Sequence, residues 1–196
     1  MKKIVFGAIA LVAGLFSTAN AQIQEGNWMV GGNLVGANFG LNSGSGYDFS
    51  IQPKGAYFIK DNVALGGYVN LGFSGAKDAP TTFVYNVGAL GRYYLSPGEQ
   101  GVDNLLNHGR WFFEANVGVG GTSISKGGSS SNGLNFGFGP GYSYFITPNI
   151  GLEGLVKYDA NAGFGNGGYT NRITFGLGFQ IYLPSGQAKR IANDVQ

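Results

Sequence analysis

The chain of 196 residues has no cysteine and only one histidine. Without cysteine, an exported domain cannot use the disulfides on which small secreted domains often depend. A single histidine, His108, excludes a metal site built from a cluster of histidine and cysteine ligands. It also leaves only one residue that could act as the base for a nucleophilic serine. We therefore expect no catalytic residues, no metal site and no cofactor.

Charge is scarce as well, because only 11% of the residues are Asp, Glu, Lys or Arg and the net charge is +2. The basic residues are scattered, so the basic patch typical of a nucleic-acid-binding protein is missing and no nucleic-acid partner is expected. Aromatic residues, in contrast, reach 14% and glycine reaches 37 residues. Disordered glycine-rich chains are poor in aromatic residues, so this composition favours an ordered protein in contact with lipid.

No hydrophobic run is long enough to cross a bilayer as a helix. The longest, Ile4–Phe16, falls well short of the roughly 20 residues that such a helix needs. It follows Lys2 and Lys3 and precedes the small-residue triplet Ala19–Ala21. This order of charged, apolar and small residues is typical of a secretory signal peptide. We expect an exported protein whose signal peptide is cleaved after Ala21.

The rest of the chain alternates between apolar and polar residues with a period of two, which is the pattern of strands with two different faces. In the block Tyr47–Ile59, Tyr57 and other large residues stand at odd-numbered positions, whereas Asp48 and Lys54 stand at even-numbered ones. Residues of one parity, odd or even, lie on the same face of a strand. Clusters of Gly, Pro, Asn, Asp and Ser separate the alternating blocks, and longer Gly/Ser-rich loops are expected near 123–133 and 161–168. The blocks are Trp28–Leu41, Tyr47–Ile59, Val63–Ser74, Thr81–Leu95, Trp111–Thr122, Leu134–Phe145, Ile150–Ala160 and Arg172–Leu183.

These eight blocks predict an all-β fold, an eight-stranded antiparallel up-and-down transmembrane β-barrel. Each block is long enough for the roughly 9–11 residues of a tilted membrane-spanning strand. An even number of strands places the N- and C-termini of the chain on the same side of the membrane. The parity of the first block changes near Val35 and Gly36, which predicts a β-bulge there. The expected organisation is a signal peptide at 1–21, one barrel at 22–183 and a short polar periplasmic tail at 184–196.

The charged residues decide between a membrane barrel and a soluble, lipocalin-like barrel, because the latter has an apolar interior. All eight charges of the blocks have the parity opposite to the large apolar residues, and they comprise four acids and four bases. They are Asp48, Lys54, Arg92, Glu114, Glu153, Lys157, Asp159 and Arg172. An eight-stranded lumen is too narrow for the large apolar set, so we expect the charges to face inward and the apolar residues to face lipid.

Aromatic residues support this orientation, because several of them have the outward parity at the end of the barrel that carries the termini. Such a ring of aromatic residues is typical of a membrane interface. The predicted girdle is Trp28, Tyr57, Tyr93, Trp111 and Tyr144.

Two ion pairs are expected among the inward charges. Arg92 and Glu114 lie at matching positions on adjacent strands, and Arg172 can meet Asp159 across the last hairpin. Well hydrogen-bonded pairs in a narrow interior of low dielectric constant attract strongly enough to offset desolvation. The network is expected to plug the lumen, and the alternative is a narrow path for ions or small solutes.

The chain resembles the OmpA/OmpX-type superfamily of small outer-membrane β-barrel proteins over nearly all of its mature length. The turn segment Tyr144–Glu153, echoed by Tyr57–Val63, and the final strand Thr174–Ile181 carry this resemblance. The final strand is similar to the assembly signal that the barrel-insertion machinery reads, here at Gly176, Phe179 and Ile181. Relatives usually end at this signal with an aromatic residue, whereas a polar tail follows here and is too short for a peptidoglycan-binding domain.

The resemblance implies an integral protein of the outer membrane of a Gram-negative-type envelope, with a role in envelope integrity, surface interaction or minor permeability. The implied partners are outer-membrane lipid and lipopolysaccharide, together with the barrel-assembly machinery and periplasmic chaperones during biogenesis. A surface partner cannot be named from the sequence. A lipid-modifying outer-membrane enzyme is a less favoured alternative, because it would have to depend on His108.

Overall fold

The computed structural model describes residues 23–39, 46–77, 79–95, 109–125, 130–164 and 168–185. The predicted signal peptide at 1–21 and His108 lie outside the described residues, as does 186–196, which is most of the predicted tail. Among the described residues there is no helix long and apolar enough to cross a membrane.

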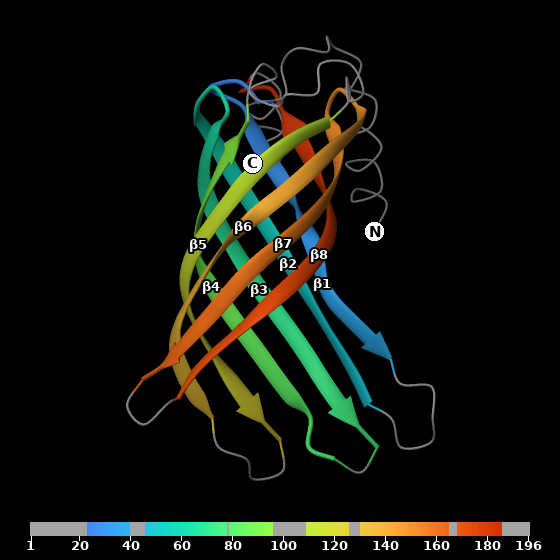
Figure 1. Ribbon diagram of the computed structural model, residues 1–196, viewed down its shortest axis with the longest axis vertical. Helices are drawn as coiled ribbons and strands as arrows, with labels where there is room; N and C mark the ends of the chain where they lie inside the picture. The colour runs from blue at the N-terminus through green and yellow to red at the C-terminus, as the bar shows by residue number, and fades with distance from the viewer. Residues whose placement is uncertain are drawn as a thin grey trace, which may run out of the picture.

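Eight antiparallel strands form one closed barrel in which every strand pairs with its neighbours in sequence and β1 pairs with β8 (Figure 1). The predicted fold class is therefore confirmed. Trp28 at the start of β1 pairs with Leu183 at the end of β8, so both lie at one end, here called the terminal end, and the other is the loop end. The strands are β1 Trp28–Phe39, β2 Gly46–Lys60, β3 Val63–Ala76, β4 Thr82–Tyr94, β5 Gly109–Ile124, β6 Ser131–Thr147, β7 Ile150–Gly163 and β8 Tyr169–Leu183.

A bulge interrupts β1 where the sequence predicts it. The register of β1 against β2 shifts between Val35 and Ala37. Gly36 has a φ of 59°, in the left-handed region that glycine adopts without a steric cost. The extra residue explains why the apolar parity changes along this strand.

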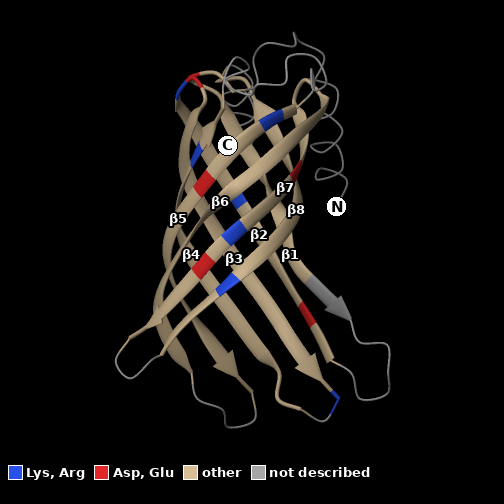
Figure 2. Cartoon of the chain, viewed as in Figure 1, with Lys and Arg blue, Asp and Glu red and all other residues tan. Residues whose placement is uncertain are grey.

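The two faces of each strand differ in burial as the alternation predicts. In β5, Phe112, Glu114 and Asn116 are buried in the lumen, whereas Trp111 and Val117 are exposed on the outside. Most large exposed residues of the other strands are also apolar or aromatic, and Figure 2 shows the few charged residues scattered over a largely uncharged barrel. An apolar outer face with a polar interior is the arrangement of a barrel in lipid.

At the loop end, several strands extend further than the alternation predicts. β5 and β6 stay paired as far as Thr122 and Ser131, and β7 and β8 as far as Ala162 and Tyr169. The loops expected at 123–133 and 161–168 are therefore partly strand, because a ladder of backbone hydrogen bonds continues through Gly, Ser and Asn wherever a partner strand is already in place.

Inward glycines make room for the large residues of a narrow lumen. A β-carbon on Gly141 of β6 would overlap the ring of Phe112 on β5, and one on Gly137 would overlap the carboxylate of Asp159. One on Gly118 would lie 2.6 Å from the hydroxyl of Tyr68. Glycine at these positions thus leaves room for the large inward side chains of nearby strands.

We expect Gly141→Ala to lower the free energy of unfolding by about 1–3 kcal/mol, because the added methyl group overpacks the lumen against Phe112. Gly154→Ala on β7 is the matched control, since a β-carbon there meets no atom within 4 Å. Urea unfolding in lipid vesicles, followed by tryptophan fluorescence, measures both changes. Equal effects of the two substitutions would show that the lumen does not depend on glycine at position 141.

Candidate functional site

The lumen is filled in layers, and the first layer, at the terminal end, is aromatic. This aromatic layer consists of Phe58, Tyr94, Phe112, Phe145 and Tyr182, all buried. The ring of Tyr94 lies 5.5 Å from that of Phe112, and the ring of Phe145 lies 5.3 Å from that of Tyr182. The hydroxyls of Tyr94 and Tyr182 are hydrogen-bonded at 2.7 Å. Side chains of five strands thus close the lumen at this end.

The second layer is a cluster of buried charges, called here the ion layer: Lys54, Arg92, Glu114 and Glu153. Arg92 Nη2 lies 2.7 Å from Glu114 Oε2, and Arg92 Nη1 lies 2.6 Å from Glu153 Oε1. Lys54 Nζ donates a hydrogen bond of 2.8 Å to the same oxygen of Glu114. Because the four residues belong to β2, β4, β5 and β7, their contacts cross the lumen from wall to wall.

Arg92 joins the ion layer to the aromatic layer. Its Nη1 also donates to the hydroxyl of Tyr94 at 2.8 Å and contacts the sulfur of Met29 at 3.3 Å. Its guanidinium carbon lies 3.9 Å from the centre of the Phe112 ring, within the range of a cation–π contact. A planar guanidinium presents several donors in fixed directions, so one arginine can hold two carboxylates and a phenol at once.

The third layer, towards the loop end, is built mainly from amides. This amide layer consists of Tyr68, Asn116, Asn135 and Lys157. Lys157 Nζ donates to Asn116 Oδ1 at 2.6 Å, and Asn116 Nδ2 donates to the Tyr68 hydroxyl and to Asn135 Oδ1 at 3.0 and 3.1 Å. Lys157 also lies 3.9 Å from Glu114 Oε1, which connects this layer to the ion layer.

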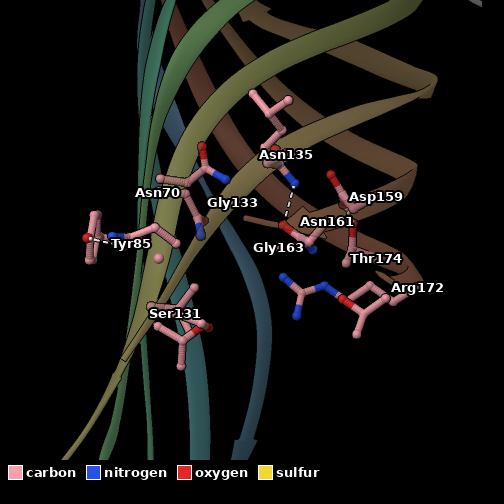
Figure 3. Close-up of a pocket in the computed structure, with 18 of the residues that line it drawn as sticks. Asn70, Tyr85, Ser131, Gly133, Asn135, Asp159, Asn161, Gly163, Arg172 and Thr174 are labelled. Atoms are coloured by element: carbon pink, nitrogen blue, oxygen red, sulfur yellow. Dashed lines mark hydrogen bonds between the residues drawn. The ribbon is translucent and has the colours of Figure 1, made fainter. Parts of the chain in front are cut away.

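Above the amide layer the lumen opens into a polar cavity of about 340 Å³, called here the cup (Figure 3). Figure 3 shows Asn135 and Asn161 hydrogen-bonded on one side of it, with Arg172 and Thr174 on strand β8. The amide layer is its floor, since Tyr68, Asn135 and Lys157 line it. Its other polar lining residues include Gln52, Asn70, Tyr85, Asn86, Asn132, Asp159, Asn161, Thr170, Arg172 and Thr174.

Six of the eight predicted lumen charges lie in or next to this network, and two do not. Lys54, Arg92, Glu114, Glu153, Lys157 and Asp159 are buried. The proposed pairing of Arg172 with Asp159 is wrong: the two residues are opposite each other in register, yet Asp159 accepts a hydrogen bond from Thr174 and lies 3.7 Å from Lys157. Asp48 and Arg172 are exposed, because both lie on the outer part of a strand near the loop end, where water can solvate them.

The six buried charges balance, because Lys54, Arg92 and Lys157 carry three positive charges and the three carboxylates carry three negative ones. Removing charges from water is costly, and only close opposite charges and further hydrogen bonds compensate for it. The network therefore holds as a unit, and loss of one member leaves its partners buried and uncompensated.

Sequence reasoning missed the aromatic layer and the amide layer. Phe58, Phe112 and Phe145 have the inward parity, and this was the signal that could have identified an apolar layer inside the lumen. Asn116 and Asn135 have it too, but alternation alone does not reveal which inward residues touch across the barrel. Those contacts depend on strand tilt and register.

The predicted aromatic girdle lies on the outside at the terminal end. Its members are between 38% and 45% exposed: Trp28, Tyr57, Tyr93, Trp111 and Tyr144. Trp28 and Tyr57, paired in register, have ring centres 5.2 Å apart. In the predicted assembly signal, Phe179 is exposed on the outer face, Ile181 is half-buried and Gly176 is buried. Recognition of these three residues by the insertion machinery stays a prediction.

We expect Glu114→Gln to lower the free energy of unfolding by about 3–5 kcal/mol, because it leaves Lys54 and Arg92 buried without the carboxylate they share. Glu25→Gln, which removes the same charge from an exposed position, should change the free energy by less than about 0.5 kcal/mol. Both values come from urea titrations in lipid vesicles. A Glu114→Gln barrel as stable as the Glu25→Gln barrel would rule out a dependence on the ion layer.

No protein-family model and no curated relative matches the chain. Among solved structures, Neisserial surface protein A (NspA) matches with 20% identity and a TM-score of 0.53, over 81% of this chain and 97% of that one. Ail of Yersinia pestis matches with 14% identity and a TM-score of 0.48, over 82% of this chain and 100% of that one. With the likeness to NspA added to its closed barrel, apolar outer face and charged lumen, the chain has the fold of a small eight-stranded outer-membrane β-barrel.

Proposed function

We propose that the protein is a sealed, non-conducting barrel of the outer membrane with a structural role in envelope integrity or surface interaction. The observation that carries this proposal is the pair of stacked layers across the lumen. The aromatic layer brings the rings of Tyr94 and Phe112 together, and the ion layer joins opposite walls through Arg92, Glu114 and Glu153. An eight-stranded barrel is narrow enough for such layers to fill it.

An ion channel is the alternative function that the sequence leaves open, and the geometry opposes it. An ion passing the lumen would have to displace Arg92 from both of its carboxylates and then separate the hydroxyls of Tyr94 and Tyr182. Conduction requires sites that bind an ion weakly enough to release it. Here the carboxylates already hold fixed cations at distances of 2.6–2.8 Å.

Enzymatic activity is not part of the proposal. The carboxylate of Glu114 is engaged by Arg92 and Lys54, and that of Glu153 by Arg92 and Tyr182, rather than by a nucleophile and its base. Among the described residues, no group of three or more His, Cys, Asp or Glu side chains could hold a metal ion.

The proposal includes export and assembly. Residues 1–21 act as the signal peptide, so that the mature chain begins at Gln22, and periplasmic chaperones deliver it to the barrel-assembly machinery. Gly176, Phe179 and Ile181 serve as the assembly signal, and the supporting observation is that Phe179 projects outward where another protein can contact it. Outer-membrane lipid and lipopolysaccharide then surround the apolar outer face.

In planar bilayers, we expect the purified full-length mature protein to produce no unitary current steps, because both layers block the lumen. A large water-filled porin, inserted in the same bilayers, controls for successful incorporation. Regular current steps whose number scales with protein concentration would show that the protein is a narrow channel and not a sealed barrel.

In cells, we expect deletion of the gene to increase sensitivity to detergent combined with EDTA, because a barrel that stabilises the membrane would be missing. Wild-type protein should restore resistance, whereas Glu114→Gln should restore it less well, in proportion to its lower stability and abundance. Survival curves measure the effect. If deletion left the sensitivity unchanged, a role in envelope integrity would be excluded, and surface interaction would be the remaining proposed role.

A further inference from the structure

Among the described residues, the ladder that joins β1 to β8, called here the seam, stops short of the loop end. The ladder between these strands ends at Val35 and Gly176. From there to Tyr169, β8 pairs with β7 alone, and β1 beyond Gly36 pairs with β2 alone. Figure 1 shows β1 and β8 diverging towards the loop end.

This geometry leaves backbone groups of β8 without a strand partner on one side. Every second residue of 169–175 directs its N–H and C=O groups towards β1, where the described residues supply no ladder. Water can solvate the groups nearest the loop end, whereas each group at the depth of the hydrocarbon costs several kcal/mol without a polar partner. Within the described residues, β1 supplies no ladder on this side, so water or the polar head of a lipid supplies these partners.

The cup reaches this opening from inside. Its lining includes Val35 and Gln52 on the β1–β2 side and Arg172 and Thr174 on the β8 side. Gln52 is only 6% exposed, and its Oε1 accepts no hydrogen bond from the residues that the structure describes. A buried acceptor of this kind calls for a donor within the cup.

The cup also carries one uncompensated positive charge. Lys157 and Asp159 lie 3.7 Å apart and balance each other. Arg172 has no hydrogen bond or ion pair with any of the described residues, and in Figure 3 its guanidinium extends from β8 towards the centre of the cup. A free guanidinium is suited to bind the oxygens of a carboxylate or phosphate.

Next to the opening, the outer face of β8 is the most exposed apolar surface that the structure describes. Ile173, Phe175 and Leu177 are 66%, 68% and 74% exposed, whereas Val117 and Val119 on β5 are 56% and 49% exposed. A polar cup with one uncompensated positive charge thus adjoins a strip of three apolar side chains on the outer face of β8. A ligand that fits both parts has an anionic polar head and a hydrocarbon chain.

We propose that the seam binds an anionic membrane amphiphile. Its phosphate or carboxylate head enters the cup sideways and contacts Arg172, a hydroxyl or amide of the head donates to Gln52, and its chain lies along Ile173, Phe175 and Leu177. The backbone groups of 169–175 find polar partners in the head. This inference depends on the membrane insertion that the proposed function assumes.

The test uses the full-length mature protein in lipid nanodiscs with photoreactive probes that carry a diazirine in the acyl chain, one of phosphatidic acid and one of phosphatidylcholine. Cross-linked residues are mapped by mass spectrometry. We expect the phosphatidic acid probe to label 173–177 on β8 about tenfold more than 117–119 on β5, and the phosphatidylcholine probe to show no such preference. Arg172→Gln should abolish the preference. Arg110→Gln, which removes the same charge near the terminal end, should preserve it.

Four outcomes would overturn the proposal. These are equal labelling of β8 and β5 by the anionic probe, a preference that survives Arg172→Gln, full competition by free glycerol phosphate, and dimers linked through 169–175 by an added bifunctional protein cross-linker without lipid labelling there. The third would make the cup a site for small soluble anions, and the fourth would make the seam an interface between copies of the chain.

A heat-dependent gel shift in SDS, typical of closed barrels, is recorded for each variant. A wild-type protein without this shift would refute membrane insertion and so separate failure of the proposed function from failure of the lipid site.

Discussion

The contact between Arg92 and its two carboxylates is the interaction on which the interior of this barrel depends. A guanidinium without access to water can persist only if anions and acceptors surround it, and here Glu114, Glu153 and Tyr94 do so. These partners come from three strands, so the position of each strand relative to the others is constrained by one side chain. The glycines opposite the large inward residues follow from the same constraint, because the filled layers of the lumen leave no room for a β-carbon at these positions.

The order of the layers gives the two ends of the barrel different properties. Aromatic rings close the terminal end, charges and amides occupy the middle, and the cup lies towards the loop end, beside the point where the β1–β8 ladder ends. Such a molecule separates the two sides of a membrane while offering polar groups to only one of them. A structural role and a lipid site at the seam are therefore compatible, since neither requires passage through the lumen.

Much of the site could be foreseen from parity, and the remainder could not. The alternation placed Arg92 and Glu114 on the same face of neighbouring strands, and hydrogen-bond register then brought them together. For Arg172 and Asp159 the same reasoning failed, although they too are opposite each other, because Asp159 has nearer partners in Thr174 and Lys157. Contacts between adjacent strands follow from pairing, whereas the choice among several partners depends on side-chain reach and access to water.

The sequence by itself determined the class of fold, the number of strands, the bulge at Gly36 and the inward direction of the charges, because a period of two and the cost of placing charge in lipid are local, additive properties of the chain. Only the tertiary structure decided that Arg92 meets Glu153 across the lumen, that five aromatic rings gather into one layer and that the β1–β8 ladder ends early. These features arise from closure, tilt and register. They relate residues far apart in the sequence, and no local pattern records them.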